Sequence, residues 1–121
     1  MQSTRTRTIS LLLATSLSGI ALLTAVPAQA AGQAVDMTEG NPKDEKTWVF
    51  TPRDITVKKG TAVAWTNKGK QPHTAAANDG SFDSGTMKGG ARFEHVFNAP
   101  GEFPYTCTFH PGMTGMVRVT P

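Results

Sequence analysis

The sequence predicts an all-β fold, a Greek-key β-sandwich of antiparallel strands. Residues after 46 form about seven short apolar runs, separated by clusters of Gly, Pro, Asn and Asp, which is the spacing of a sandwich. Within several runs, apolar and polar residues alternate with the period of two that turns one face of a strand toward a core. After residue 30, no window longer than about ten residues keeps a helical period.

Residues 1–30 have the organisation of a secretory signal peptide. Arg5 and Arg7 precede a mostly apolar stretch over residues 9–26, and Ala28-Gln29-Ala30 supplies an A-x-A cleavage pattern. We therefore expect an exported protein, with the periplasm as the favoured compartment and no membrane association of the mature form. The alternative is an uncleaved anchor, but Ser, Thr and Gly residues dilute the apolar stretch.

Removal of the leader leaves 91 of the 121 residues, enough for one compact domain. We place this domain at residues 47–121. Residues 31–46, with few apolar side chains, are expected to form a loose N-terminal arm or a poorly formed first strand. Without Arg5 and Arg7, 10 of the 12 basic residues remain against 9 acidic ones. This near-neutral balance argues against nucleic acid as a partner, because phosphate binding needs a clustered basic face.

The expected strands follow one another closely through the domain. Ile55 and Val57 share one face of a strand, and so do Val63 and Trp65 in the next. The predicted strands are residues 47–50, 55–58, 61–66, 73–77, 91–97, 102–107 and 116–119.

The strongest functional signal is CTFHPGM, residues 107–113, which holds the only cysteine of the chain. A single cysteine cannot form an intrachain disulfide, so the thiol of an exported protein needs another role. Tyr105 and Cys107 share a face of their strand, so Cys107 points inward if Tyr105 lies in the core. The Pro-Gly turn that follows brings His110 and Met113 to the same end of the sandwich.

Two further histidines are candidates to complete a metal site. His73 starts a strand after a polar loop and is the favoured candidate, whereas His95 shares a strand face with Phe93 and Phe97, a position typical of packing. Two imidazoles, a thiolate and a thioether form the pattern of electron-transfer copper. Methionine is not a usual zinc ligand, and iron–sulfur clusters need more thiolates than this chain has.

Two other roles of these residues stay open at this point. The four side chains could pack at one end of the sandwich without a metal. Cys107 and His110 could also be a nucleophile and its base, but an inward-facing thiol is poorly placed to reach a substrate. We therefore expect a metal-binding protein with no catalytic residues rather than an enzyme.

Pro72-His73-Thr74 and the segment from Tyr105 to Met113, with its clustered C-x-x-H-x-x-M, resemble the type 1 blue copper proteins, the cupredoxins of the plastocyanin and amicyanin kind. The resemblance extends from about Trp48 to the C-terminus. It implies that residues 47–121 form a cupredoxin-like copper-binding domain of eight strands. The additional strand is expected near Phe82 or in the N-terminal arm.

The same resemblance implies one copper ion in a type 1 site, with His73, Cys107, His110 and Met113 as ligands. Met116 is the competing axial ligand, but the two residues between histidine and methionine, as in amicyanin, favour Met113. Plastocyanin-like proteins often carry Asn after the first histidine, where this chain has Thr74. The hydrogen bonding beside the cysteine is therefore left open.

The function that the resemblance implies is transfer of single electrons by Cu(II) and Cu(I). His110 is the expected electron port, because its turn also carries Phe109 and a Pro-Gly pair that suit a small apolar surface. We expect a monomer that docks transiently with a redox protein there, since redox interfaces tend to be small. The alternative function is a periplasmic copper carrier or copper-resistance protein that binds the ion without redox cycling.

Overall fold

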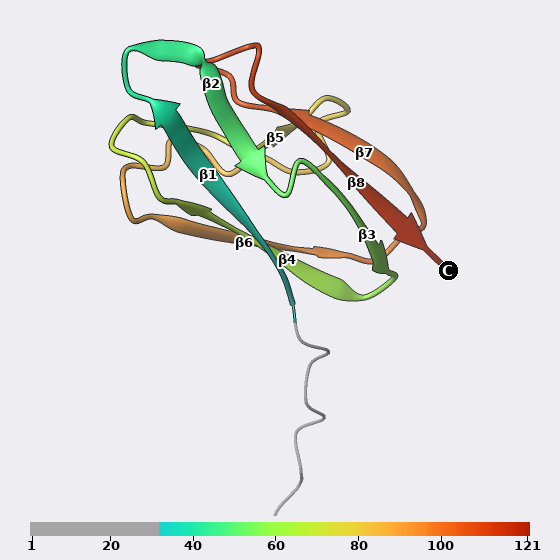
Figure 1. The fold of residues 1–121 in the computed structure, drawn as a ribbon. Coiled ribbons are helices and arrows are strands. Elements are labelled where there is room, and N and C mark those ends of the chain that lie inside the picture. Colours follow the sequence, from blue (N-terminus) through green and yellow to red (C-terminus); the bar gives the residue numbers. More distant parts are fainter. Residues whose placement is uncertain (1–31) are drawn as a thin grey trace, which may run out of the picture.

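The computed structural model describes residues 32–121, so the predicted signal peptide over residues 1–30 lies outside the described residues. The described chain forms eight β-strands in two four-stranded sheets (Figure 1). This confirms the predicted all-β sandwich of seven to eight strands. No helix suited to crossing a membrane occurs between residues 32 and 121. The strands are β1 (Gln33–Asn41), β2 (Asp44–Thr51), β3 (Asp54–Lys58), β4 (Thr61–Asn67), β5 (Ala76–Ala77), β6 (Arg92–Phe97), β7 (Gly101–Thr106) and β8 (Thr114–Thr120).

The strand order is β2-β1-β4-β6 in one sheet and β3-β8-β7-β5 in the other. The chain crosses between the sheets after each strand from β2 to β6, so sheet neighbours need not be neighbours in sequence. As a result, β1 pairs with β4, and β3 with β8, in parallel, whereas the other pairings are antiparallel. The expectation of purely antiparallel strands is wrong for these two pairs, because a strand that returns from the opposite sheet can run alongside its neighbour in the same direction.

The segment expected as a loose N-terminal arm, residues 31–46, belongs largely to the sandwich. β1 lies inside its sheet, with β2 on one side and β4 on the other. Val35 and Met37 alternate inward from β1 and are 1% and 0% exposed. The expected limit between arm and domain, residue 47, falls within β2. β1 is therefore the additional strand, and it lies in the segment with few apolar side chains.

The predicted strand over residues 73–77 is reduced to the two residues of β5. His73 forms an isolated antiparallel bridge with Met87, in which its N–H donates to the Met87 carbonyl at 3.1 Å and its carbonyl accepts from the Met87 N–H at 2.8 Å. The backbone around His73 is thus fixed by two hydrogen bonds although it lies outside a regular strand.

The core between the sheets is rich in aromatic rings. The ring centroid of Trp65 lies 5.2 Å from that of Phe82 and 5.5 Å from that of Tyr105. His95 packs against Phe82 and Phe97, at centroid distances of 5.1 and 4.8 Å. Burial lowers the pKa of His95 below its usual value. The expectation that His95 is a packing residue agrees with these contacts.

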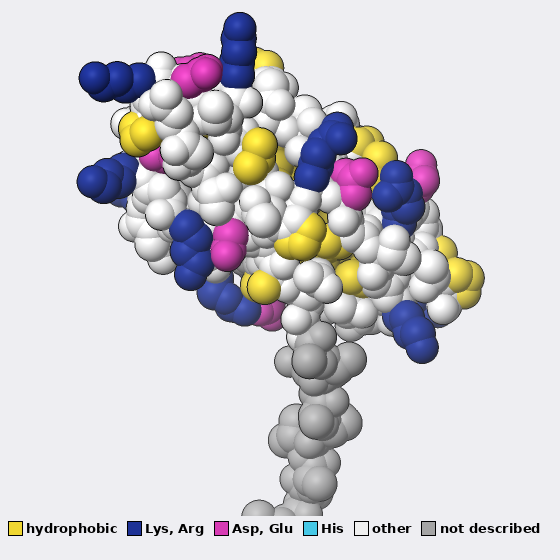
Figure 2. Space-filling model, viewed as in Figure 1, with side chains coloured by type: hydrophobic (Ala, Val, Ile, Leu, Met, Phe, Trp, Pro, Cys, Tyr) yellow, Lys and Arg dark blue, Asp and Glu magenta, His cyan; other side chains and the backbone are white. Residues whose placement is uncertain are grey.

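One face of the domain has a surface of mixed character. On the face drawn in Figure 2, Lys and Arg side chains are interspersed with Asp and Glu, and hydrophobic side chains appear only in small separate patches. On β6, Arg92 and Glu94 form an exposed ion pair.

Candidate metal centre

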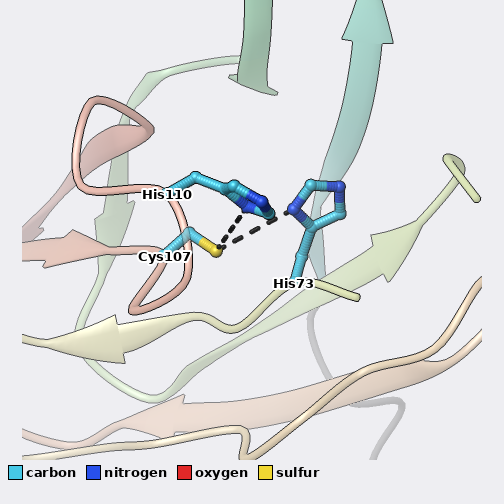
Figure 3. A group of neighbouring side chains, drawn as sticks. All are labelled: His73, Cys107 and His110. Carbon is cyan, nitrogen blue, oxygen red and sulfur yellow. Dashed lines mark hydrogen bonds between the residues drawn. The ribbon is translucent and has the colours of Figure 1, made fainter. Parts of the chain in front are cut away.

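Three side chains with metal-binding atoms point toward one another at one end of the sandwich (Figure 3). His73 lies in the connection between β4 and β5, Cys107 follows β7, and His110 lies in the loop between β7 and β8. Their ligand atoms all lie within 4.8 Å of one another. Cys107 Sγ is 3.8 Å from His73 Nδ1 and 3.4 Å from His110 Nδ1. Both imidazoles therefore present the same ring nitrogen to the thiol.

The loop that carries Cys107 and His110 is closed by its own backbone. The Cys107 N–H donates to the Met113 carbonyl at 2.9 Å, the His110 N–H donates to the Cys107 carbonyl at 3.2 Å, and the Met113 N–H donates to the His110 carbonyl at 2.8 Å. On either side of the loop, Thr106 and Thr114 are paired in β7 and β8. These contacts hold the ends of the loop together and fix the positions from which its side chains leave.

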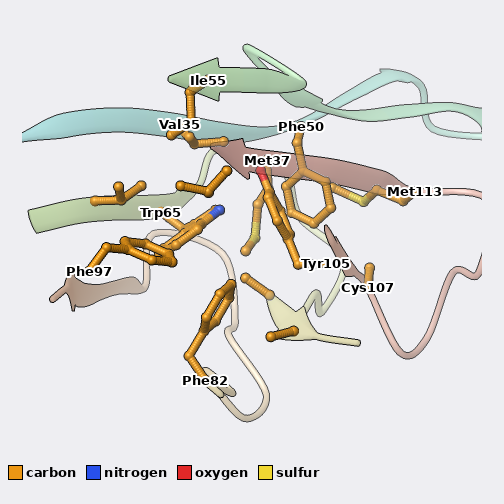
Figure 4. Close-up of a cluster of buried hydrophobic side chains, with 14 of the residues drawn as sticks. Val35, Met37, Phe50, Ile55, Trp65, Phe82, Phe97, Tyr105, Cys107 and Met113 are labelled. Atoms are coloured by element: carbon orange, nitrogen blue, oxygen red, sulfur yellow. The ribbon is translucent and has the colours of Figure 1, made fainter. Parts of the chain in front are cut away.

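Met113 is the last residue of this loop, and its side chain is buried. Its side chain is 1% exposed, and Figure 4 shows Met113 and Cys107 at one end of the buried cluster. Met116 occupies a different setting, within β8, where it pairs with Pro104. Because the next residue, Val117, is fully buried, strand alternation turns Met116 to the other face of the sheet.

His73 is held on its outer side by Glu39 of β1. His73 Nε2 lies 3.0 Å from Glu39 Oε1, which also accepts the backbone N–H of Lys70 at 3.0 Å and of Gln71 at 2.8 Å. Burial lowers the pKa of His73 below its usual value, although Glu39 opposes this effect. With Nε2–H donating to Glu39, His73 Nδ1 is left as the acceptor that faces the thiol.

The pKa of Glu39 is below its usual value. Burial acts to raise this pKa, but the hydrogen bonds from the Gln71 and Lys70 amides and from His73 together outweigh burial. Near neutral pH, Glu39 is therefore an ionised carboxylate and His73 a neutral imidazole. Neutral imidazole is the form of histidine that binds metals.

The hydrogen bonding beside Cys107, left open by the sequence, is supplied by Thr74. The Thr74 N–H lies 3.4 Å from Cys107 Sγ and points at it as a donor. The Thr74 hydroxyl accepts the N–H of Thr108 at 2.8 Å and lies 3.1 Å from the Thr108 hydroxyl. Thr74 thus connects the segment of His73 to the loop of Cys107.

The indole ring of Trp48 packs against both histidines. The Trp48 ring meets the His110 ring edge-on at 4.6 Å and the His73 ring at 5.7 Å. The sequence predicted His73, Cys107 and His110 as neighbours but gave no indication of Trp48 and Glu39, which both come from the β1–β2 hairpin. The alternation of Val35 and Met37 was the available signal that this segment is a strand with an inward face.

His110 connects the buried site to the surface. Its side chain is half-buried and borders a shallow hollow that Pro111 and Gly112 also line. The neighbouring Phe109 is 48% exposed, more than any other large hydrophobic side chain in residues 32–121. The site therefore approaches solvent through His110 and not through Cys107, which is 0% exposed.

The donor set of this site fits copper. A buried thiol, two Nδ1 atoms directed at it and a buried thioether at the same end provide soft and intermediate ligands, the combination that favours copper. A structural zinc site would close a tetrahedron with cysteine or histidine, and the cluster found in residues 32–121 holds only three such groups.

Comparisons with known proteins agree with this chemistry. Residues 35–120 match the family of copper-binding proteins described as the plastocyanin/azurin family. The chain is 31% identical over 111 residues to amicyanin-alpha of Methylorubrum extorquens, covering 84% of this chain and 93% of that protein. It is 34% identical over 92 residues to the chloroplastic plastocyanin of Tetradesmus obliquus, covering 68% of this chain and 63% of that protein. A solved purple cupredoxin from Nitrosopumilus maritimus has a TM-score of 0.65 and 32% identity, covering 73% of this chain and 99% of that one.

Proposed function

The chain belongs to the plastocyanin/azurin family of copper-binding proteins, the type 1 blue copper cupredoxins, and on this premise we propose that it is an exported carrier of single electrons between redox partners. One observation carries the proposal: the buried thiol of Cys107 faces the Nδ1 atoms of two histidines. A thiolate with two imidazoles is the ligand pattern of electron-transfer copper.

The ligands in this proposal are His73, Cys107 and His110, with Met113 as the weak axial ligand. Met113 is favoured over Met116 because its backbone is hydrogen-bonded to Cys107 within the same short loop. When bound, copper supplies a couple, Cu(II) and Cu(I), that gains and loses one electron.

The contribution of the protein is to hold these side chains still. Cys107 and His110 are fixed by the closed loop, and His73 by its two backbone bonds to Met87 and by Glu39. Ligands held by a rigid scaffold move little when the charge of the site changes, which keeps the cost of each transfer low. Burial of Cys107 also excludes water from the thiolate.

In this proposal electrons enter and leave through His110. The imidazole borders the surface next to the exposed ring of Phe109 and the hollow at Pro111 and Gly112. A small apolar surface of this kind suits a brief encounter between a monomer and a redox protein. We propose no catalytic role for Cys107, because a fully buried thiol cannot reach a substrate.

Export to the periplasm is the localisation that we propose. It depends on the sequence of residues 1–30, with its basic start, apolar stretch and A-x-A pattern. The presence of a shorter chain beginning near residue 31 in a periplasmic fraction tests this part of the proposal, and a full-length chain in the membrane fraction would contradict it.

The electron-carrier role is tested by two rates measured on the copper-loaded protein. Fast electron self-exchange between the Cu(I) and Cu(II) forms, seen as NMR line broadening, with slow loss of copper to a chelator, is expected. Rapid copper release without measurable self-exchange would instead favour a copper carrier.

Matched variants test the ligand assignment. Met113→Leu is expected to shift the reduction potential and the visible spectrum, whereas Met116→Leu leaves both unchanged. The reverse pattern would assign the axial position to Met116.

A further inference from the structure

We infer that Glu39 and Trp48 are positioning residues that fix the two histidines of the site, an inference that rests on the proposed copper ligands. The two residues lie directly opposite each other in the β1–β2 pairing. Side chains at such paired positions project from the same face of a sheet. The hairpin therefore directs a carboxylate and an indole toward the metal centre, although it supplies none of the proposed ligands.

The Glu39 carboxylate is held in place by hydrogen bonds other than the one to His73. Its Oε1 accepts the backbone N–H groups of Lys70 and Gln71, so the chain just before His73 holds the carboxylate in place. The Glu39 side chain is only 6% exposed and that of His73 is 0% exposed. A carboxylate fixed behind a metal-binding imidazole selects its tautomer, sets the ring orientation and makes the ring a stronger ligand.

Gly69 provides an independent sign that the place of Glu39 is built into the fold. A Cβ atom at Gly69 would overlap the carboxyl group of Glu39. Because residue 69 has no side chain, the Glu39 carboxylate has room to reach His73. A substitution at Gly69 can therefore displace Glu39 without changing any ligand or the carboxylate itself.

Trp48 acts on the rings by contact. Its indole N–H donates to the carbonyl of Asn41 at 2.8 Å, which fixes the ring plane. The ring is nearly perpendicular to both imidazoles, with interplanar angles of 81° to His110 and 89° to His73. Edge-to-face packing of this kind restricts rotation of the imidazoles about their side-chain bonds.

The first test uses the copper-free full chain and its histidine ¹⁵N NMR spectrum at a pH where the imidazoles are neutral. In the wild type, His73 is expected as the Nε2–H tautomer. Glu39→Gln keeps an acceptor oxygen and is expected to keep this tautomer. Glu39→Ala and Gly69→Ala are expected to give a mixture of tautomers, whereas the surface control Glu102→Gln leaves the spectrum of His73 unchanged.

The second test measures Cu(II) affinity for the same variants. Loss of a group that orients a metal ligand typically weakens affinity about 10- to 100-fold. We expect a decrease in affinity in this range for Glu39→Ala and Gly69→Ala, and a smaller decrease for Glu39→Gln. Glu39→Gln is also expected to have a higher reduction potential, because it lacks the negative charge that favours Cu(II). Trp48→Leu is expected to weaken affinity while His73 keeps its tautomer.

An Nδ1–H tautomer at His73 in the wild type would overturn the role of Glu39. The same conclusion would follow if Glu39→Ala and Gly69→Ala bound Cu(II) with affinities within two-fold of that of Glu102→Gln. Unchanged affinity in Trp48→Leu would overturn the role of Trp48. If Glu39→Ala does not fold, the His73 tautomer in the wild type and the Cu(II) affinity of Glu39→Gln still test the role of Glu39. Failure of the wild type to bind copper would contradict the proposed function, whereas the NMR test would still report on Glu39.

Discussion

Titration of Tyr105 offers a sharp test of the core, because Tyr105 is the only tyrosine of the chain. Its ring is 0% exposed, and within residues 32–121 its hydroxyl has no hydrogen-bond partner. Burial raises the pKa of Tyr105 from 10.0 to about 12; the indole of Trp65 partly offsets this effect, but its N–H does not reach hydrogen-bonding geometry either.

The raised pKa has a consequence for stability at alkaline pH. Between pH 10 and 12 the unfolded chain loses the phenol proton while the folded chain keeps it, so the free energy of unfolding decreases as pH rises. Each pH unit is worth about 1.4 kcal/mol, so the full loss from this residue is about 2.7 kcal/mol. Well below pH 10 Tyr105 adds no pH dependence to stability, because its phenol is protonated in both states.

The assay is the ultraviolet absorbance of the phenolate in the copper-free protein, followed together with far-ultraviolet circular dichroism. Phenolate is expected to appear only near pH 12 or together with unfolding. In Tyr105→Phe, the decline in stability as pH rises through both pKa values is expected to be smaller, by up to about 2.7 kcal/mol. A phenolate midpoint near pH 10 with an intact folded spectrum would refute the burial of this hydroxyl.

Three other substitutions test the packing and the hydrogen bonds around the site. Gly115→Ala places a Cβ against the Tyr105 ring and is expected to lower the free energy of unfolding by about 1–3 kcal/mol, measured by urea denaturation; no change would contradict this packing. Thr74→Val removes the acceptor of the Thr108 N–H and is expected to cost about 1–3 kcal/mol in the same assay, with a shifted reduction potential, and an unchanged potential would argue against a link to the copper site. His95 has a pKa lowered by burial, so the unfolded chain binds its proton first and stability falls as pH decreases below 6.5. His95→Phe is expected to reduce this fall, and identical pH profiles would contradict the prediction.

The loop of Cys107, His110 and Met113 was the part of the molecule most accessible from sequence. Cys107, His110 and Met113 lie within seven residues, so a short turn between two strands already constrains them to one end of the sandwich. His73 was identified by its place at the start of an expected strand, and the chemistry of the set pointed to copper. Local spacing and donor chemistry are sufficient for such a site because few conformations of a short loop are possible.

The contribution of the N-terminal segment was not predictable to the same degree. Glu39 reaches His73 across 34 residues of sequence, through a strand whose partners, β2 and β4, include a parallel neighbour. Local patterns do not report such pairings. β1 also has few apolar residues, because only Val35 and Met37 are fully buried from it. A polar strand inside a sheet is easily mistaken for a loose arm.

The most direct test of the copper site is the visible absorption spectrum of the purified protein after addition of one equivalent of Cu(II). We predict an intense thiolate-to-copper band that is lost in both Cys107→Ser and His73→Ala, since each removes a group from the converging set. A colourless or weakly coloured mixture in the wild type would contradict the account, because it would mean that these side chains do not bind one copper ion together.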